Sequence, residues 1–283
     1  MNSKSHALNV LGKNQKFQEI IETCQELLYS SPEAESHLKY LDSRIKNRAD
    51  QKKFQFGFLP PFPLVRKLLS SRVISNLKDL SLYREWKGFN NVYNAISGKC
   101  HLEYNNLIFP IKNEYDQIVG LSGRTLLSKE EMKEKKTDKY KNSFFIKNEI
   151  LFGLNFAKEE IAKTKKVFLT EGQVDTISAQ IAGLKNVVSV NGTSLSIYQI
   201  YLLKKFGGPD LEIGVLFDND SPGDSGFSKI CSKYNQYLKK IKRIRPSPEF
   251  SDIDEMITKS NLSHPEICKL INDQMLTSGN TET

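Results

Sequence analysis

Two stretches decide the fold: VFLTEGQVDTISAQIAGLKNVVSVNGTSLS at residues 167–196 and LEIGVLFDNDSPG at residues 211–223. In each, a short apolar run ends in acidic residues, which are Glu171 in the first stretch and Asp218 and Asp220 in the second. An open α/β sheet builds its functional site at the carboxyl ends of buried strands. We therefore expect these carboxylates to face one crevice.

Carboxylates gathered in one place repel each other unless a cation neutralises them. Their hard oxygen atoms suit Mg²⁺ or Mn²⁺, so the pattern predicts a divalent-metal site for phosphoryl-transfer chemistry. In an extended strand, residues i and i+2 point to the same side, so Asp218 and Asp220 could hold one ion or a close pair. The segment DNDSPG is also good turn chemistry, and that alternative stays open.

Two further acidic groups have both a metal-binding and a structural interpretation. Asp175 follows Glu171 by four residues and could instead interact with the dipole of the helix that it begins. Asp252 and Asp254, in the run SDIDE, could support a metal or could cap a helix, as Ser and Asp often do.

Charge and composition limit the class of protein. The 283 residues carry a formal net charge of +8 with a sequence pI near 9.1, which fits a polyanionic partner such as DNA, RNA or an acidic membrane, or a merely soluble basic protein. The four cysteines are far apart and lack zinc-ligand spacing, so we expect no zinc. No signal core or membrane-length apolar run is present, so we expect a cytoplasmic protein with no membrane partner.

The hydrophobic period predicts four regions along the chain. They are an N-terminal helical segment (1–30), a basic mixed α+β subdomain (31–164), an α/β domain with a small parallel sheet flanked by helices (165–260), and a C-terminal helix with a frayed tail (261–283). Within the second region we expect short helices over 63–86, a pair of strands in LIFPI and QIVGLSGR, and a solvated loop, or one that orders on a ligand, over 128–142.

Several motifs occur together in one order along the chain. They are LIFPIKNEYDQIVGLSGR (107–124), DKYKNS (138–143), FIKNEILFGL (145–154), VFLTEGQVDTISA (167–179), NGTSLS (191–196), VLFDNDSPGDSG (215–226) and FSDIDEMI (250–257). The pairing of EGxxD with DxD resembles the TOPRIM domain of primases, topoisomerases and some nucleases. The full set resembles the catalytic core of the bacterial DnaG-type primases, and weaker similarity in HLKYLDSRI (37–45) and FQFGFLPP (54–61) extends it towards the N-terminus.

This resemblance implies a role for each matching residue. Glu171, Asp218 and Asp220 would be catalytic and bind two divalent metal ions, Mg²⁺ or Mn²⁺, with Asp175, Asp252 and Asp254 supporting them. The residues implied in binding the template strand, the primer or the nucleoside triphosphate are Arg124, Lys139, Asn142 and Lys147, with Gly192 and Thr193 in a loop beside the metals. Arg offers phosphate a bidentate fork and Lys a compact charge.

The resemblance implies a DNA primase that makes short RNA primers on single-stranded DNA from nucleoside triphosphates. The sequence departs from the family pattern in having Asn106 where Arg is common and Asn219 where Gly is usual. It also lacks the family's zinc-binding cysteines and its C-terminal helicase-binding domain. We therefore expect a minimal or split primase from a phage or another mobile element, with a replicative helicase and a zinc-binding domain as partners in trans. A TOPRIM nuclease and a non-catalytic nucleic-acid-binding module remain the alternatives.

Overall fold

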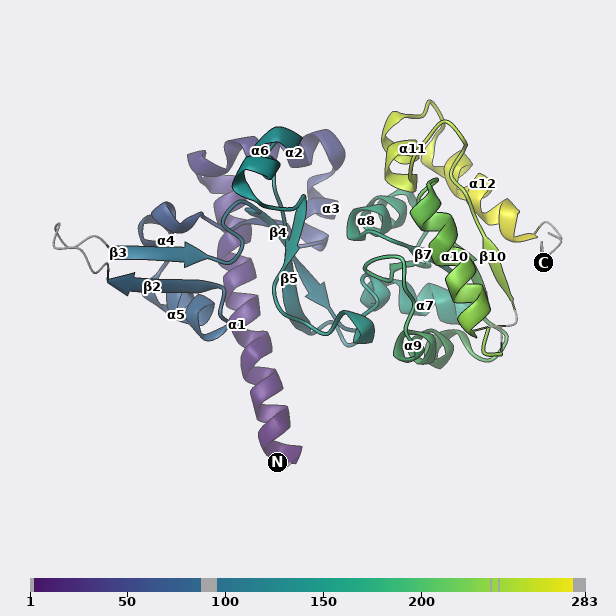
Figure 1. Ribbon diagram of the computed structural model, residues 1–283, viewed down its shortest axis with the longest axis horizontal. Coiled ribbons are helices and arrows are strands. Elements are labelled where there is room, and N and C mark those ends of the chain that lie inside the picture. The colour runs from purple at the N-terminus through teal and green to yellow at the C-terminus, as the bar shows by residue number, and fades with distance from the viewer. Residues whose placement is uncertain (1–2, 88–95, 235, 239, 277–283) are drawn as a thin grey trace. The chain divides into compact units, whose positions relative to one another are not determined.

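The computed structural model describes residues 3–276 apart from 88–95, 235 and 239 (Figure 1). The described chain forms two compact units, and the chain passes from the first to the second between Phe145 and Ile146. The turn Lys112–Asp116 groups with the second unit although its flanking strands belong to the first. No helix among the described residues is both long and apolar enough to span a membrane.

The N-terminal unit combines helices with antiparallel strands. Its elements are α1 Ser3–Ser30, η1 Pro32–Ala34, α2 Glu35–Arg44, α3 Arg48–Lys53, β1 Gly57–Phe58, α4 Phe62–Leu68, α5 Ser71–Asp79, β2 Tyr83–Lys87, β3 Ile96–Cys100, β4 Leu107–Lys112, β5 Ile118–Arg124, α6 Lys129–Lys135 and β6 Tyr140–Asn142. Four strands form a sheet in the order β1-β4-β5-β6, and β2 pairs with β3 separately. The buried stripe of α1, which includes Ile20, Ile21 and Cys24, packs in the core of this unit.

Two local predictions for this unit need correction. The short helices predicted over 63–86 are present as α4 and α5, but they end at Asp79, and β2 begins at Tyr83. Residues 128–142 are not a loop but contain α6 and β6. Helix α6 needs no buried face because a capping box begins it: Ser128 Oγ accepts a hydrogen bond from Glu131 N at 3.2 Å, and Glu131 Oε2 accepts one from Ser128 N at 2.8 Å.

The C-terminal unit alternates strands and helices. Its elements are η2 Lys147–Glu149, α7 Leu154–Thr164, β7 Lys166–Thr170, α8 Gln173–Ala182, β8 Val187–Ser189, α9 Ile197–Gly207, β9 Glu212–Val215, α10 Ser221–Tyr234, β10 Ile241–Arg243, α11 Ile253–Lys259 and α12 His264–Leu276. The sheet order is β10-β9-β7-β8, and every adjacent pair is parallel. The predicted fold class, a small parallel α/β sheet preceded by an α+β region, is confirmed.

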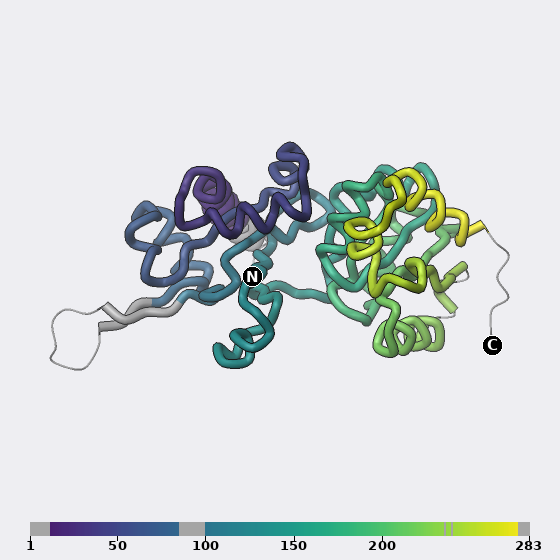
Figure 2. The backbone as a smooth tube through the Cα atoms, turned by 90° about the horizontal axis from the view of Figure 1, so that it is seen from above, coloured from purple at the N-terminus to yellow at the C-terminus, as the bar shows by residue number. Residues whose placement is uncertain are grey.

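Helices cover both faces of this sheet, as Figure 1 and the backbone trace in Figure 2 show. Val167 and Leu169 of β7 belong to one core with α7, α9 and α10, whereas Phe168 between them belongs to another with α8, α11 and α12. Side chains alternate between the faces of a strand, so a strand buried on both faces is continuously apolar. Val167, Phe168 and Leu169 are therefore all apolar, and the polar residue Thr170 ends the strand. The tail predicted to fray, residues 277–283, lies outside the described residues.

Two glycines of the N-terminal unit give a stability test. A methyl group on Gly123 in β5 would lie 2.3 Å from the carbonyl oxygen of Asn105, whereas one on Gly12 in α1 would meet no atom within 4 Å. We expect Gly123→Ala to lower the free energy of unfolding by about 1–3 kcal/mol. Gly12→Ala should raise it by about 0.5–1 kcal/mol, because alanine is the better helix former. Chemical denaturation of the two variants measures both effects, and equal shifts would contradict the prediction.

Candidate active site

Glu171 joins the ends of two neighbouring strands. It directly follows β7, and its Oε1 accepts a hydrogen bond from the backbone N–H of Asp218 at 3.1 Å. Asp218 itself lies in the segment between β9 and α10. The carboxylate that follows β7 is thus hydrogen-bonded to the backbone that follows β9.

Asp218 and Asp220 do not share a strand, so the argument from alternating strand positions was wrong. Strand β9 ends at Val215, and α10 begins at Ser221, so both aspartates lie in the turn between them. Asp220 Oδ1 accepts a hydrogen bond from Gly223 N at 2.7 Å, in the first turn of α10. The turn chemistry of DNDSPG, rather than strand geometry, sets the positions of these carboxylates.

Oxygen atoms from all three acidic residues converge above Gly223. A methyl group on Gly223 would lie 3.1 Å from Glu171 Oε1, 3.2 Å from Asp220 Oδ1 and 2.4 Å from the carbonyl oxygen of Asp218. Glycine is therefore required here for close approach, and its missing side chain leaves a small space lined by oxygen atoms.

Two carboxyl groups at this site have raised pKa values. Partial burial, followed by repulsion from Asp218, raises the pKa of Glu171 to about 7. Asp175, whose Oδ2 accepts a hydrogen bond from Gly172 N at 3.2 Å, is more deeply buried. Burial, with the charges of Asp252, Asp218 and Asp254, raises its pKa to about 8. The two carboxyls therefore resist ionisation unless a cation lies close by.

Asp252 and Asp254 both have structural roles. Asp252 is the N-cap of α11, with its Oδ1 accepting a hydrogen bond from Glu255 N at 2.6 Å. Asp254 is buried and accepts a hydrogen bond from Ser178 Oγ at 2.6 Å, which ties α11 to α8. Capping of α11 thus accounts for the position of Asp252. That Asp252 or Asp254 supports a bound metal ion stays a prediction.

The loop that contains Gly192 and Thr193 lies next to Glu171. The backbone carbonyl of Glu171 accepts hydrogen bonds from Gly192 N at 3.0 Å and from Ser189 Oγ at 2.7 Å. Thr193 packs so closely on α10 that a methyl group on Gly226 would lie 2.9 Å from its Cβ. This loop therefore fixes the backbone of Glu171 relative to the start of α10.

Arg243 is the main residue that the sequence analysis missed. At the end of β10, its Nη1 donates to the carbonyls of Val215 and Phe217 at 3.1 and 2.9 Å, and its Nη2 donates to that of Asp218 at 2.7 Å. Its side chain is 10% exposed and also pairs with Asp224. The sequence KRIR (242–245) gives no signal for which of its arginines points inward. Arg243 thus provides hydrogen-bond donors for backbone carbonyl groups at the end of β9 and just after it.

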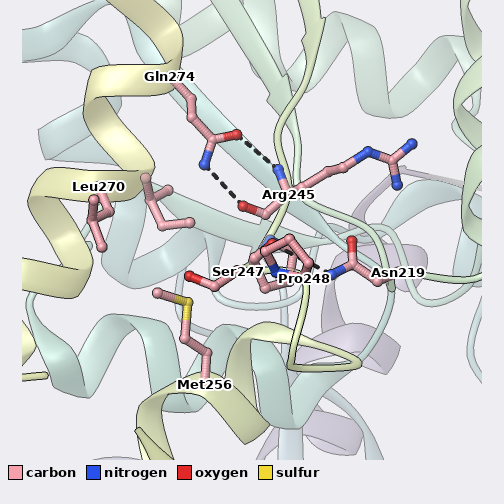
Figure 3. A pocket seen from close by; sticks show the side chains of 9 residues that line it. Asn219, Arg245, Ser247, Pro248, Met256, Leu270 and Gln274 are labelled. Carbon is pink, nitrogen blue, oxygen red and sulfur yellow. Dashed lines mark hydrogen bonds between the residues drawn. The ribbon is translucent and has the colours of Figure 1, made fainter. Parts of the chain in front are cut away.

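Asn219, between the two aspartates, borders a separate pocket (Figure 3). Its backbone N–H donates to Ser251 O at 2.7 Å and its Nδ2 donates to Phe250 O at 2.9 Å, while its buried Oδ1 accepts no hydrogen bond from the described residues. The pocket, of about 520 Å³, is lined by Asn219, Arg245, Pro246, Ser247, Pro248, Met256, Leu270, Ile271 and Gln274. None of the carboxylates above Gly223 lines it, so the pocket is distinct from the acidic group.

Three residues predicted to bind nucleic acid lie on or beside two paired strands of the N-terminal unit. Arg124 in β5 is opposite Tyr140 in β6, and its Nε donates to the Tyr140 hydroxyl at 3.2 Å. Asn142 lies two residues further along β6, with a buried Oδ1 that has no partner among the described residues. Lys139 is exposed just before β6. Lys147, also exposed, belongs to the other unit, in η2.

Comparisons with known proteins agree with this arrangement. Residues 24–158 match the family described as DNA primase catalytic core, N-terminal domain, and residues 168–257 match the family described as Toprim-like. The DNA primase of Lactococcus lactis subsp. lactis (strain IL1403) is 30% identical to this chain over 230 residues, which are 81% of this chain and 34% of that protein. The chain has the catalytic core of the DnaG primases.

Solved structures show the same fold. The RNA polymerase domain of Mycobacterium tuberculosis primase DnaG matches with a TM-score of 0.73 at 22% identity, covering 96% of this chain and 84% of that chain. A DnaG primase catalytic domain bound to single-stranded DNA matches with a TM-score of 0.70 at 20% identity, covering 96% and 82%. This primase core spans about a third of the length of the curated relatives that it matches.

The acidic group of this primase core fits a divalent cation. Its potential ligands are all oxygen atoms, burial and then mutual repulsion raise the pKa values of its carboxyl groups, and the space above Gly223 is one that a side chain would fill. No three acidic, histidine or cysteine side chains in the described parts of the chain are already grouped as ligands of an ion. Binding would therefore require the carboxylates to draw together.

The raised pKa values predict that the metal-free chain loses stability as the pH rises. The folded chain binds a proton more tightly at Glu171 and Asp175 than the unfolded chain, whose values are near 4.5 and 3.8. The stabilisation is complete below those values and is lost as the pH passes about 7 and 8. Melting temperatures measured in EDTA from pH 5 to pH 8.5 should fall, and Asp175→Asn should reduce that fall. An Asp175→Asn profile identical to the wild type would contradict the assignment.

Arg243 should be more important than its neighbour Arg245. Arg243→Lys keeps the charge but cannot reach the carbonyls of Val215, Phe217 and Asp218 together, so we expect a loss of about 2–4 kcal/mol in unfolding free energy. Arg245 is half exposed, and its side chain bonds Asp224 at 2.8 Å. Arg245→Lys is therefore the matched control and should change stability by less than about 1 kcal/mol. Chemical denaturation compares the two, and equal losses would show that the carbonyl contacts are unimportant.

Proposed function

We propose that this chain is the catalytic subunit of a DNA primase, which synthesises short RNA primers on single-stranded DNA by metal-dependent nucleotidyl transfer. The observation that carries the proposal is the convergence of oxygen atoms from Glu171, Asp218 and Asp220 above Gly223. This acidic group occurs in a chain whose N-terminal unit matches the primase catalytic core. A metal-carboxylate group alone would fit many phosphoryl-transfer enzymes, and the N-terminal domain narrows the choice to a primase.

The acidic residues would act by holding and orienting cations. When bound, two Mg²⁺ or Mn²⁺ ions would lower the pKa of the primer 3′-hydroxyl. They would also neutralise negative charge on the pyrophosphate leaving group. Glu171, Asp218 and Asp220 would hold these ions, and Asp175 would add negative charge behind them. Arg243 would keep the backbone of the turn in place by binding its carbonyl groups, so only the carboxyl side chains would have to move when a cation binds.

The N-terminal unit would bind the template, the primer or the nucleotide, with Arg124, Lys139 and Asn142 contacting phosphate or sugar groups. In the C-terminal unit, Lys147 and the loop Gly192–Thr193 would also bind nucleic acid or the nucleotide. The net charge of +8 supports a polyanionic ligand, and binding should weaken steeply as salt rises. The DnaG catalytic domain solved with single-stranded DNA gives the same expectation for this chain.

We also propose that other proteins supply start-site selection and helicase coupling. A replicative helicase and a zinc-binding domain acting in trans are the partners that this proposal requires, and the cytoplasm is its location. The four cysteines support a zinc-free chain, because Cys24 and Cys100 are buried in an apolar core and Cys231 and Cys268 are far from them in sequence. A phage or mobile-element origin remains a hypothesis.

Glu171→Gln tests the proposed chemistry. It keeps the shape of the side chain and its hydrogen-bond acceptor but removes the charge, so we expect primer synthesis to fall at least about 100-fold with no loss of the fold. The matched control is Glu212→Gln, at the opposite end of the same sheet, whose carboxylate is partly exposed near Lys166 and Lys240. It should retain wild-type activity. The assay follows labelled nucleotide incorporation on single-stranded DNA with Mg²⁺ or Mn²⁺.

The same assay separates the alternatives. Near-wild-type synthesis by Glu171→Gln would contradict the metal assignment. Degradation of labelled single strands with metal but without nucleotides would favour a nuclease, and tight binding without incorporation in either metal would favour a binding module. Candidate helicase and zinc-domain proteins should be tested in parallel, because initiation on an unprimed template is the step most dependent on them.

A further inference from the structure

Another pocket of the C-terminal unit lies between α10 and the loop that follows β8. Its volume is about 320 Å³, and it is lined by Thr193, Ser194, Leu195, Lys229, Ile230, Ser232, Lys233 and Tyr234. Two of these side chains carry an ammonium group, and none carries a carboxylate. We call this hollow the lysine pocket. A concave site lined by charges of one sign attracts ligands of the opposite charge, so the lysine pocket is a candidate site for an anion.

The two lysines of the pocket have no counter-charge on their own helix. Asp224 is the one acidic residue in the sequence of α10, and its Oδ1 already accepts hydrogen bonds from Arg243 Nε at 3.2 Å and from Arg245 Nη2 at 2.8 Å. Neither Lys229 nor Lys233 pairs with a carboxylate in the described part of the chain. The helix dipole favours Lys233, in the last turn of α10, but not Lys229, one turn earlier. Four residues apart, the two charges repel, and an anion bound between them would relieve that repulsion.

The other accessible groups of the pocket suit a phosphate rather than a base. The hydroxyls of Thr193 and Ser194 form no hydrogen bond with another described residue, so both can donate to an anion. The apolar lining residues Leu195, Ile230 and Tyr234 are at most 5% exposed, so they offer no open surface on which a base could stack. Phosphate contacts of this kind position a strand without reading its sequence.

The lysine pocket lies on the same side of α10 as the acidic group. Gly226, Lys229 and Lys233 follow Gly223 at intervals of three or four residues, which places them along one side of the helix. Thr193 packs against Gly226, between the pocket and the point where the acidic oxygen atoms converge. At a rise of 1.5 Å per residue, the two lysines lie about 9 and 15 Å further along the helix axis than Gly223. A strand that passes the acidic group could therefore place one of its next phosphates in the pocket.

We propose that the lysine pocket binds a backbone phosphate of a nucleic-acid strand that passes the acidic group. This inference rests on the proposed function. The two lysines would supply the charge, and the hydroxyls of Thr193 and Ser194 would orient the phosphate. The loop that forms this wall of the pocket also holds the backbone of Glu171, whose carbonyl oxygen accepts a hydrogen bond from Gly192 N at 3.0 Å. A phosphate bound to the loop would therefore also restrict the backbone of a residue proposed to hold the metal ions.

Binding of a fluorescent single-stranded oligodeoxythymidine in EDTA, measured by anisotropy across a salt series, tests the pocket without a contribution from bound metal. The double variant Lys229→Gln/Lys233→Gln should bind about 3- to 10-fold more weakly at low salt, and its salt slope should be smaller by about 0.7, the value for one phosphate on a single strand. The matched control is Lys163→Gln/Lys185→Gln, which removes two exposed lysines that precede β7 and β8, at the opposite edge of the same sheet. It removes the same charge and should keep the wild-type affinity and slope.

Three results would overturn the inference while leaving the proposed function standing. One is wild-type affinity and slope for Lys229→Gln/Lys233→Gln, and another is an equal loss in the two double variants, which would indicate general charge attraction. The third comes from a fluorescent nucleoside triphosphate measured in the same way, whose affinity should be equal for the two double variants. Weaker binding of that nucleotide alone by Lys229→Gln/Lys233→Gln would assign the pocket to a triphosphate instead. Thermal denaturation should show both double variants folded, because all four lysines are exposed. A wild-type chain that binds no single strand at any salt concentration would contradict the proposed function itself.

Discussion

Repulsion among carboxylates at the carboxyl ends of β7 and β9 is the constraint on which the C-terminal unit depends. The fold does not remove this repulsion but surrounds it with groups that hold the negative charges in place. Backbone N–H groups bind Glu171 and Asp220, and Arg243 binds the carbonyls beneath them. Burial, together with the repulsion that remains, raises the pKa values of Glu171 and Asp175. The cation binding that we propose would follow from this imbalance rather than from any single residue.

The parallel sheet and the acidic group were predictable because both depend on short-range patterns. A strand buried on both faces must be apolar throughout, so VFLT and IGVLF stand out, and the acids that end them must meet at one sheet edge. The geometry of Asp218 and Asp220 was harder to predict from the sequence. The residue at which β9 ends depends on its backbone pairing with β7 and β10. The role of Arg243 depends on contacts with residues about 25 positions away, which local sequence patterns do not specify. Helix α6 could have been recognised from its capping-box spacing, despite its lack of an apolar stripe.

The N-terminal unit handles charge in the opposite way. Several of its basic side chains, including Arg48 and Arg124, lie over tyrosine rings, which attract a cation without neutralising it. Arg124 keeps its full charge and a restricted orientation, while Arg48 gives up its donors to Asp42 and Gln51. The acceptors around each side chain therefore distinguish Arg48 from Arg124, the arginine that we propose binds a ligand. Sequence position alone marks Arg124 as the end of an apolar strand but gives no indication that Tyr40 contacts it.

Asn219 has a consequence for the thermodynamics of metal binding. Its main chain and side chain fasten the acidic turn to residues 250 and 251. A turn built on glycine would lose much conformational entropy when an ion ordered it. Here that entropy has already been lost during folding, so the turn is preorganised. Differences in affinity among divalent ions at this site should therefore follow the enthalpy of stripping water from each ion more than the ordering of the protein.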